Sequence, residues 1–389
     1  MKSKNFQFFY GQGWTGLAQA RELDTPTTLV LAFCAPMMKQ HPHLLKEIRQ
    51  AFPNSVVAGC STSGEIHGLT ISDESISCIA IKFEKSKVRL ASQKITSMPD
   101  SFNVGQKLAS ELLTEDLRGI IVLSDGLNTN GSALVDGFNS VIDSKQTSLF
   151  GGLAADGPHF KSTWVIHQDE MQPQTVIAVG LYGADLRFET ASKGGWDIFG
   201  PERTITKSIG NELFELDGKP ALDLYKEYLG EKSKDLPASG LLFPIQIRDK
   251  NTPEERVVRT ILAVNEESKS LLFAGDVPEN SQAQLMKANF ERLIDGSAFT
   301  AEQLQKSMER NLTGDRPDES VVRLAISCVG RRLVLGQRSE EEIETLNETR
   351  HKAINVIGFY SYGELSSVST GEPCRLHNQS MTLAQIYEV

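Results

Sequence analysis

Three stretches of the chain repeat one order of events. Each begins with an apolar, strand-like run, passes through a loop and an amphipathic helix, and reaches a second apolar run. That run ends in a loop rich in glycine and small polar residues, and further strand-like residues follow. The first strands of the three copies lie at residues 28–33, 119–125 and 321–328. Because related sequences should fold in the same way, we predict three related strand–helix–strand–hairpin units.

The helices of the three copies are indicated by different signals. In the first copy, residues 41–52 place apolar side chains on one face at the helical period, namely Leu44, Leu45, Ile48 and Phe52. The second copy carries a similar stripe, formed by Leu134, Val135, Phe138, Val141 and Ile142. In the third copy, Ser339 and Glu342 have the spacing of a capping box, which predicts a helix start. One strand from Leu376 to Tyr387 is expected to close the chain.

A region of different character separates the second and third copies. Pro220 stands at the start of an expected helix that ends at Gly230. Further on we expect strands at 241–248, 257–265 and 271–274, and helices at 281–293 and 301–310. We therefore divide the chain into an N-terminal domain, residues 1–219, and a C-terminal domain, residues 220–389. Since no flexible linker separates them, we predict two packed α/β domains of mixed sheets covered by helices.

Charge and apolar patterning argue against several classes of protein. The net charge is −10, and no run of Lys or Arg offers a basic face for nucleic acid. No stretch reaches the roughly 18 apolar residues of a membrane span, and the first residues do not resemble a signal peptide. The five cysteines are scattered without a Cys-x-x-Cys pair, as expected for reduced thiols. We therefore expect a soluble, cytoplasmic protein that binds neither membrane nor nucleic acid.

The segment from Gly59 to Glu65 is the strongest candidate for a ligand site. Its polar side chains are Ser61, Thr62, Ser63 and Glu65, and it follows a strand, where ligands often bind in α/β sheets. The alternative is a tight turn whose glycines only satisfy the backbone. A nucleophile elbow does not fit because one residue too many separates the glycines, and a phosphate loop would need Gly-Lys-Ser/Thr. A hydrolase that uses Cys60 or Ser61 remains a third possibility.

Several motifs together resemble one family. The segment Gly59–Ile66, preceded by Phe52-Pro53, and the segment Leu149–Gly152 with Asp156-Gly157 resemble the FIST N-terminal domain. The FIST C-terminal domain is resembled by Phe243–Ile245, Arg259–Leu262, Phe273–Pro278, Gly358–Glu364 and Leu376–Gln379. These motifs occur in the family's order and cover most of the chain.

This resemblance implies a sensory input module of signal transduction, and not an enzyme. Members were proposed to bind small ligands such as amino acids. Some stand-alone bacterial members are haem-binding nitric oxide sensors that regulate a partner histidine kinase or a cyclic-di-GMP enzyme. The resemblance therefore implies either a haem-based sensor of this kind, which we take first, or a sensor of a small polar metabolite. Besides the first loop, we expect Tyr360, Tyr362, Glu364, Arg375 and Asn378 to contribute to the ligand site.

A haem in this chain would be non-covalent haem b, because no Cys-x-x-Cys-His motif is present. We assign His377 as its axial ligand, with His67 as the fallback, since each lies beside a candidate loop. Arg331, Arg332 and Arg375 are the candidates for the propionates. No histidine or cysteine spacing indicates a zinc site. The alternative for His377 and Asn378 is that they cap the strand by hydrogen bonds to the backbone.

Overall fold

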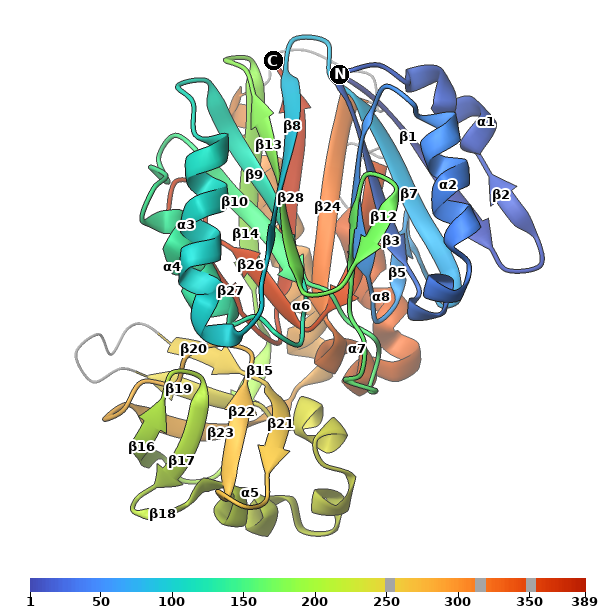
Figure 1. The fold of residues 1–389 in the computed structure, drawn as a ribbon. Coiled ribbons are helices and arrows are strands. Elements are labelled where there is room, and N and C mark those ends of the chain that lie inside the picture. Colours follow the sequence, from blue (N-terminus) through green and yellow to red (C-terminus); the bar gives the residue numbers. More distant parts are fainter. Residues whose placement is uncertain (249–255, 312–319, 348–354) are drawn as a thin grey trace.

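The computed structural model describes residues 1–248, 256–311, 320–347 and 355–389 (Figure 1). The three units form one body, which we call the ring, and β15 to β23 form a smaller lobe beneath it (Figure 1). This confirms the predicted α/β class, with mixed sheets covered by helices and three related units. The division at residues 219 and 220 stays a prediction, because in space the third unit lies beside the first two.

The ring contains three sheets, each built around the parallel strand pair of one unit. The first sheet has the order β12 (Glu170–Gln172), β11 (Val165–His167), β4 (Val56–Ser61), β3 (Thr28–Cys34), β7 (Ser75–Lys82), β1 (Lys2–Phe9) and β2 (Gly13–Thr15). The second has β27 (Arg375–His377), β26 (Gly363–Ser366), β10 (Ser148–Leu153), β9 (Leu117–Ser124), β13 (Thr175–Tyr182) and β8 (Lys87–Lys94). The third has β14 (Leu186–Lys193), β28 (Met381–Glu388), β24 (Val321–Cys328), β25 (Asn355–Ser361), β5 (Glu65–His67) and β6 (Thr70–Ser72).

Each unit places its short hairpin in a neighbouring sheet. The first unit's β5 pairs with β25 of the third, the second unit's β11 pairs with β4 of the first, and β26 of the third pairs with β10 of the second. Long strands are exchanged in the opposite direction, because β8 of the first unit pairs with β13 of the second and β14 of the second pairs with β28 of the third. No unit completes its own sheet, so hydrogen bonds between strands hold the three units together.

The inner faces of the sheets share one core, and each outer face packs under its own helices. Along β3, Leu29, Leu31 and Phe33 point into the shared core, which also takes side chains from β9 and β24. Val30 and Ala32 point outward. Because both faces are buried, the strands are continuously apolar. The covering helices are α1 (Leu17–Ala20) and α2 (Pro42–Ala51), α3 (Ser101–Leu112) and α4 (Gly131–Asn139), and α6 (Phe290–Asn311), α7 (Val329–Leu335) and α8 (Ser339–Glu344).

One glycine in each unit allows its two parallel strands to approach closely. A Cβ at Gly59 would lie 1.9 Å from the carbonyl oxygen of Ala32, at Gly151 1.9 Å from that of Val122, and at Gly358 1.7 Å from that of Ala325. Such a clash with backbone can be relieved only by separating the strands. We therefore expect alanine at any of the three glycines to lower the free energy of unfolding by about 1–3 kcal/mol or more.

Urea denaturation of the three single variants tests this expectation. The control is Gly194→Ala, because a Cβ there would meet only the carbonyl oxygen of Gln379, at 3.9 Å. Equal midpoints for the control and the three strand variants would show that the close approach is not needed.

The lobe consists of one curved set of strands with its own core. Its strands are β15 (Trp196–Ile198), β16 (Arg203–Ile209), β17 (Glu212–Leu216), β18 (Lys219–Pro220), β19 (Ile245–Arg248), β20 (Arg256–Arg259), β21 (Ile261–Asn265), β22 (Ser270–Phe273) and β23 (Gln282–Ala288). The helix α5 (Ala221–Leu229) begins after Pro220 and ends at Gly230, as predicted, and contributes Leu222 and Tyr225 to this core.

Three local predictions were wrong. The segment expected as a helix at 281–293 contains β23, which pairs with β15, β16 and β19, and the helix α6 begins only at Phe290. Ser339 is not an N-cap, because its hydroxyl donates to the carbonyls of Arg332 and Gly336. The expected final strand is divided between β27 and β28, where Gln379 has a φ of 63°. Among the described residues, no helix is long and apolar enough to cross a membrane.

Candidate functional site

Loops of the first two units and the helix α7 of the third meet around one cavity of about 580 Å³, which we call the three-unit cavity. It lies beyond the carboxyl ends of the parallel strands β3 and β4, the usual place for a ligand in such sheets. The first unit contributes Ala35–Met37, Thr62–Glu65, Asp73 and Glu74; the second contributes Asp156–His159; the third contributes Val329, Arg332, Leu333 and Gly336. A molecule bound here would therefore contact every unit of the ring.

Glu65 places a buried carboxyl group in the wall of this cavity. The Thr62 hydroxyl donates to Oε1, and the Ser75 hydroxyl and backbone N–H donate to Oε2 at 2.7 and 3.3 Å. Burial raises the pKa of Glu65 to about 8, and these hydrogen bonds offset burial only in part. At neutral pH the carboxyl is therefore mostly protonated, and it would ionise when a cation approaches.

The third unit contains the same arrangement at Glu364. Ser361, three residues earlier, donates to Oε1 at 2.8 Å, and Ser380 donates to Oε2 from its hydroxyl at 3.0 Å. Burial again raises the pKa of this carboxyl to about 8. Glu364, however, is not among the residues that line the three-unit cavity. In the second unit, Val165 occupies the equivalent position in the strand pairing, so that unit has no such carboxyl.

Arg332 of α7 forms one side of the three-unit cavity. Its guanidinium donates to both carboxylate oxygens of Asp73 at 2.7 Å and to the carbonyl of Ser63 at 2.6 Å. It also lies over the ring of Tyr360, 5.4 Å from the ring centroid. The Asp73 side chain is 66% exposed, so the ion pair between Arg332 and Asp73 lies at the protein surface. Arg332 thereby joins the third unit to the Gly59–Glu65 segment of the first unit.

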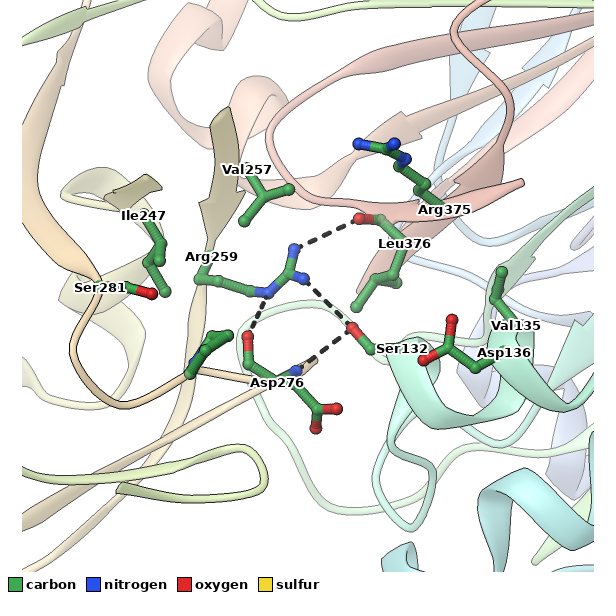
Figure 2. A pocket seen from close by; sticks show the side chains of 11 residues that line it. Ser132, Val135, Asp136, Ile247, Val257, Arg259, Asp276, Ser281, Arg375 and Leu376 are labelled. Carbon is green, nitrogen blue, oxygen red and sulfur yellow. Dashed lines mark hydrogen bonds between the residues drawn. The ribbon is translucent and has the colours of Figure 1, made fainter. Parts of the chain in front are cut away.

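A second cavity, of about 410 Å³, lies where the ring meets the lobe, and we call it the junction cavity (Figure 2). The ring contributes Ser132, Val135 and Asp136 of α4 with Arg375 and Leu376 of β27. The lobe contributes Ile247, Val257, Arg259, Asp276, Pro278 and Ser281. Arg259 crosses from the lobe to the ring, because it donates to the carbonyl of Leu376 at 3.3 Å and to the Ser132 hydroxyl at 3.2 Å (Figure 2).

The predicted ligand residues fall into separate places. Thr62, Ser63 and Glu65 line the three-unit cavity, and Arg375 lines the junction cavity. Ser61 has a structural role, since its hydroxyl accepts a hydrogen bond from the backbone N–H of Trp164 at 3.2 Å. The first loop thus partly lines the cavity and partly connects strands.

The predicted aromatic and amide residues of the third unit do not line the three-unit cavity but form hydrogen bonds near it. The Tyr360 hydroxyl donates to Glu342 at 3.1 Å. The Tyr362 hydroxyl donates to Asp156, which is part of the three-unit cavity. Asn378 donates to the carbonyl of Tyr362 at 3.2 Å and accepts from the lobe residue Thr260, so it links ring and lobe.

The residues assigned to haem do not lie together. His377 Nε2 is hydrogen-bonded to the carbonyl oxygen of Ser366 at 2.9 Å, and burial lowers its pKa to about 4. Neither His377 nor His67 is among the described residues that line the two cavities. Arg331 is engaged in a buried ion pair with Glu342.

The three-unit cavity is also a poor match for haem in charge. Its lining contains His159 but also four carboxyl groups, from Glu65, Asp73, Glu74 and Asp156, against one guanidinium. Haem propionates are themselves anionic and need cations. The lining of the three-unit cavity therefore does not fit a haem, and the predicted haem and its axial ligand stay predictions.

The nucleophiles of the hydrolase alternative are inaccessible. Cys60 and Ser61 are completely buried, and burial raises the pKa of the Cys60 thiol well above its usual range. A thiol of this kind does not form the thiolate that nucleophilic catalysis needs.

Several lining residues were not predicted from the sequence. Asp73, Glu74 and His159 line the three-unit cavity, and Ser132 and Asp136 line the junction cavity. The only available signal was for the second unit, where Asp156-Gly157 was part of the resemblance. The others lie in ordinary turns and helices, which carry no pattern of their own.

Comparison with known proteins agrees with this organisation. The family model for the FIST N domain matches residues 28–219, and the model for the FIST C domain matches residues 221–367. The chain belongs to the FIST family. FIST domains are sensory, ligand-binding domains of signal transduction and are not catalytic. The chain is also similar to an uncharacterized protein of Methanocaldococcus jannaschii, with 26% identity over 383 residues, covering 88% of this chain and 70% of the relative.

Proposed function

We propose that this FIST chain senses a small metabolite that carries an amino group, such as an amino acid, bound in the three-unit cavity. The observation that carries the proposal is the convergence of all three units on a cavity whose wall contains the buried Glu65 carboxyl. A protonated amine would meet the carboxyl groups of Glu65, Glu74 and Asp156. A ligand carboxylate would meet the Arg332 fork in place of the exposed Asp73.

Binding of an ammonium group next to Glu65 would release a proton. The pKa of Glu65 is raised to about 8 by burial, and a cation at hydrogen-bond distance lowers it again. A bound ligand would also draw together the segments of the three units that line the cavity. Such a movement would change the surface that a partner protein contacts. The predicted output partners, a histidine kinase or a cyclic-di-GMP enzyme, remain part of the proposal only as candidates for what reads that surface.

Glu65→Gln is expected to weaken binding of the amino-acid ligand by roughly tenfold to a hundredfold, the effect of losing one charged hydrogen bond. Titration calorimetry with the common amino acids measures this loss. In wild type, repeating the titration in buffers of different ionisation enthalpy should also reveal proton release, and Glu65→Gln should abolish it.

Glu364→Gln is the matched control, because it removes an equivalent buried carboxyl, which also accepts from two hydroxyls but does not line the cavity. Equal loss of binding in both variants would point to a general effect on the fold and contradict the proposal. A Soret band after reconstitution with haem, together with no amino-acid binding, would favour the haem-based sensor instead.

A further inference from the structure

Arg259 is a buried cation that makes no direct hydrogen bond or ion pair to a carboxylate of the described residues. Its side chain is 6% exposed and lines the junction cavity. All its hydrogen bonds go to neutral acceptors: the carbonyls of Asp276 at 3.0 Å, Val258 at 3.2 Å and Leu376, and the hydroxyl of Ser132. Burial lowers its pKa to about 10, so the guanidinium is still charged at neutral pH. A buried charge that is not directly paired is costly, and an anion bound against the guanidinium would relieve that cost.

Two acidic side chains, Asp276 and Asp136, line the same cavity and favour the charged form of Arg259 from a distance, but neither forms an ion pair with its guanidinium. The Asp276 carboxylate accepts a hydrogen bond from Asn130 Nδ2 at 2.5 Å and points away from the guanidinium (Figure 2). The Asp136 side chain makes no hydrogen bond or ion pair with a described residue. Burial, followed by Asp276, raises its pKa, and Arg259 offsets this in part. Asp136 is thus available to accept a hydrogen bond from a bound molecule. Arg375 adds a second guanidinium to the wall of the cavity (Figure 2).

We propose that the junction cavity is a separate binding site for a small hydroxycarboxylate, whose carboxylate pairs with Arg259 and whose hydroxyl donates to Asp136. The apolar side chains of Val135, Val257 and Leu376 would enclose its carbon skeleton. This site does not depend on the three-unit cavity, since the lining residues of the two cavities are different.

Binding at the junction cavity would link the two bodies of the protein. Its walls come from α4 and β27 of the ring and from β19 and β20 of the lobe, so the ligand contacts both. A ligand that contacts both bodies favours the relative arrangement in which both sets of contacts are made. The junction site would therefore control the position of the lobe.

L-Malate, succinate and inorganic phosphate are the probes for a titration of the full chain. We expect saturable binding of malate, weaker binding of succinate because it lacks the hydroxyl, and little binding of phosphate. Val257→Phe fills the cavity without changing its charge and should abolish malate binding. Arg259→Lys keeps the charge but loses the fork, and should weaken binding roughly tenfold to a hundredfold.

Arg323→Lys is the matched control for the arginine. Arg323 is also buried and donates to neutral acceptors, the Leu346 carbonyl and Gln385, but it does not line the junction cavity. It should leave malate binding unchanged, and so should Glu65→Gln. If Arg259→Lys fails to fold, Val257→Phe decides the question.

Three results with the wild type and the cavity-filling variant would overturn the proposal. They are the absence of malate binding to wild type, unchanged binding in Val257→Phe, and phosphate binding that is stronger than malate binding. Because Glu65→Gln tests the other cavity, loss of malate binding in that variant alone would move the malate site there and also overturn the assignment.

Discussion

Replacing Arg331 with Met is expected to lower the free energy of unfolding by about 3–5 kcal/mol, the usual cost of leaving one member of a buried ion pair unpaired. Arg331 and Glu342 are both completely buried, and Arg331 Nε donates to Glu342 Oε1 at 2.6 Å. The same guanidinium donates to the Leu293 carbonyl at 2.7 Å and the Ser297 hydroxyl at 3.0 Å. The pair thus joins α6, α7 and α8 on the third sheet. Urea denaturation followed by circular dichroism measures the change.

Two further variants separate the ion pair from general packing. The double variant Arg331→Met with Glu342→Leu should recover part of the lost stability, because no charge is left buried. The Arg292 side chain is 65% exposed and forms a surface ion pair with Asp197. Arg292→Met should therefore lower the free energy of unfolding by no more than about 1 kcal/mol. If Arg331→Met costs no more than Arg292→Met, the buried pair does not stabilise the ring.

The order and type of the main strands could be predicted because they depend on local pattern. The runs at 28–33, 119–125 and 321–328 are β3, β9 and β24, and the helix on the stripe of Leu44 and Ile48 is α2. Apolar periodicity reports burial directly, so these elements were predictable from the chain alone. The helix expected at 281–293 was wrong because tertiary pairing with β15, β16 and β19 makes that segment a strand.

The site could be predicted only in part, because the hairpins exchange between units. Glu65 and Glu364 occupy matching places in the sequence repeats, yet only Glu65 lines the three-unit cavity. The two carboxyls differ in their neighbours, since Arg332 and Gly157 of the other units both donate hydrogen bonds to Ser63 of the first loop. The same limit applies to Arg259, whose partners Ser132 and Leu376 lie 127 and 117 residues away in the chain. Local sequence patterns do not indicate contacts between residues so far apart in the chain.

Stability should fall as the pH rises from 7 to 8, and the two buried glutamates should cause about 2 kcal/mol of that fall. Their folded pKa values, both about 8, are raised above the unfolded value of 4.5. The folded protein therefore keeps protons that the unfolded chain has released, and the resulting stability is complete below pH 4.5 and lost as pH passes 8. The measurement is the free energy of unfolding at each pH for wild type and for Glu65→Gln with Glu364→Gln.

The interval from pH 7 to 8 is chosen because other buried groups then interfere least. Burial lowers the pKa of His377 to about 4, so this histidine contributes a change of opposite sign, but one that is nearly complete by pH 7. Burial raises the pKa of thiols such as Cys60 and Cys328, so they lower the stability of the folded protein only at higher pH. Their effect is the same in wild type and in the double glutamine variant. The difference between the two slopes therefore isolates Glu65 and Glu364. Parallel slopes would mean that both carboxyls are already ionised at neutral pH, and proton release on ligand binding would then also be absent.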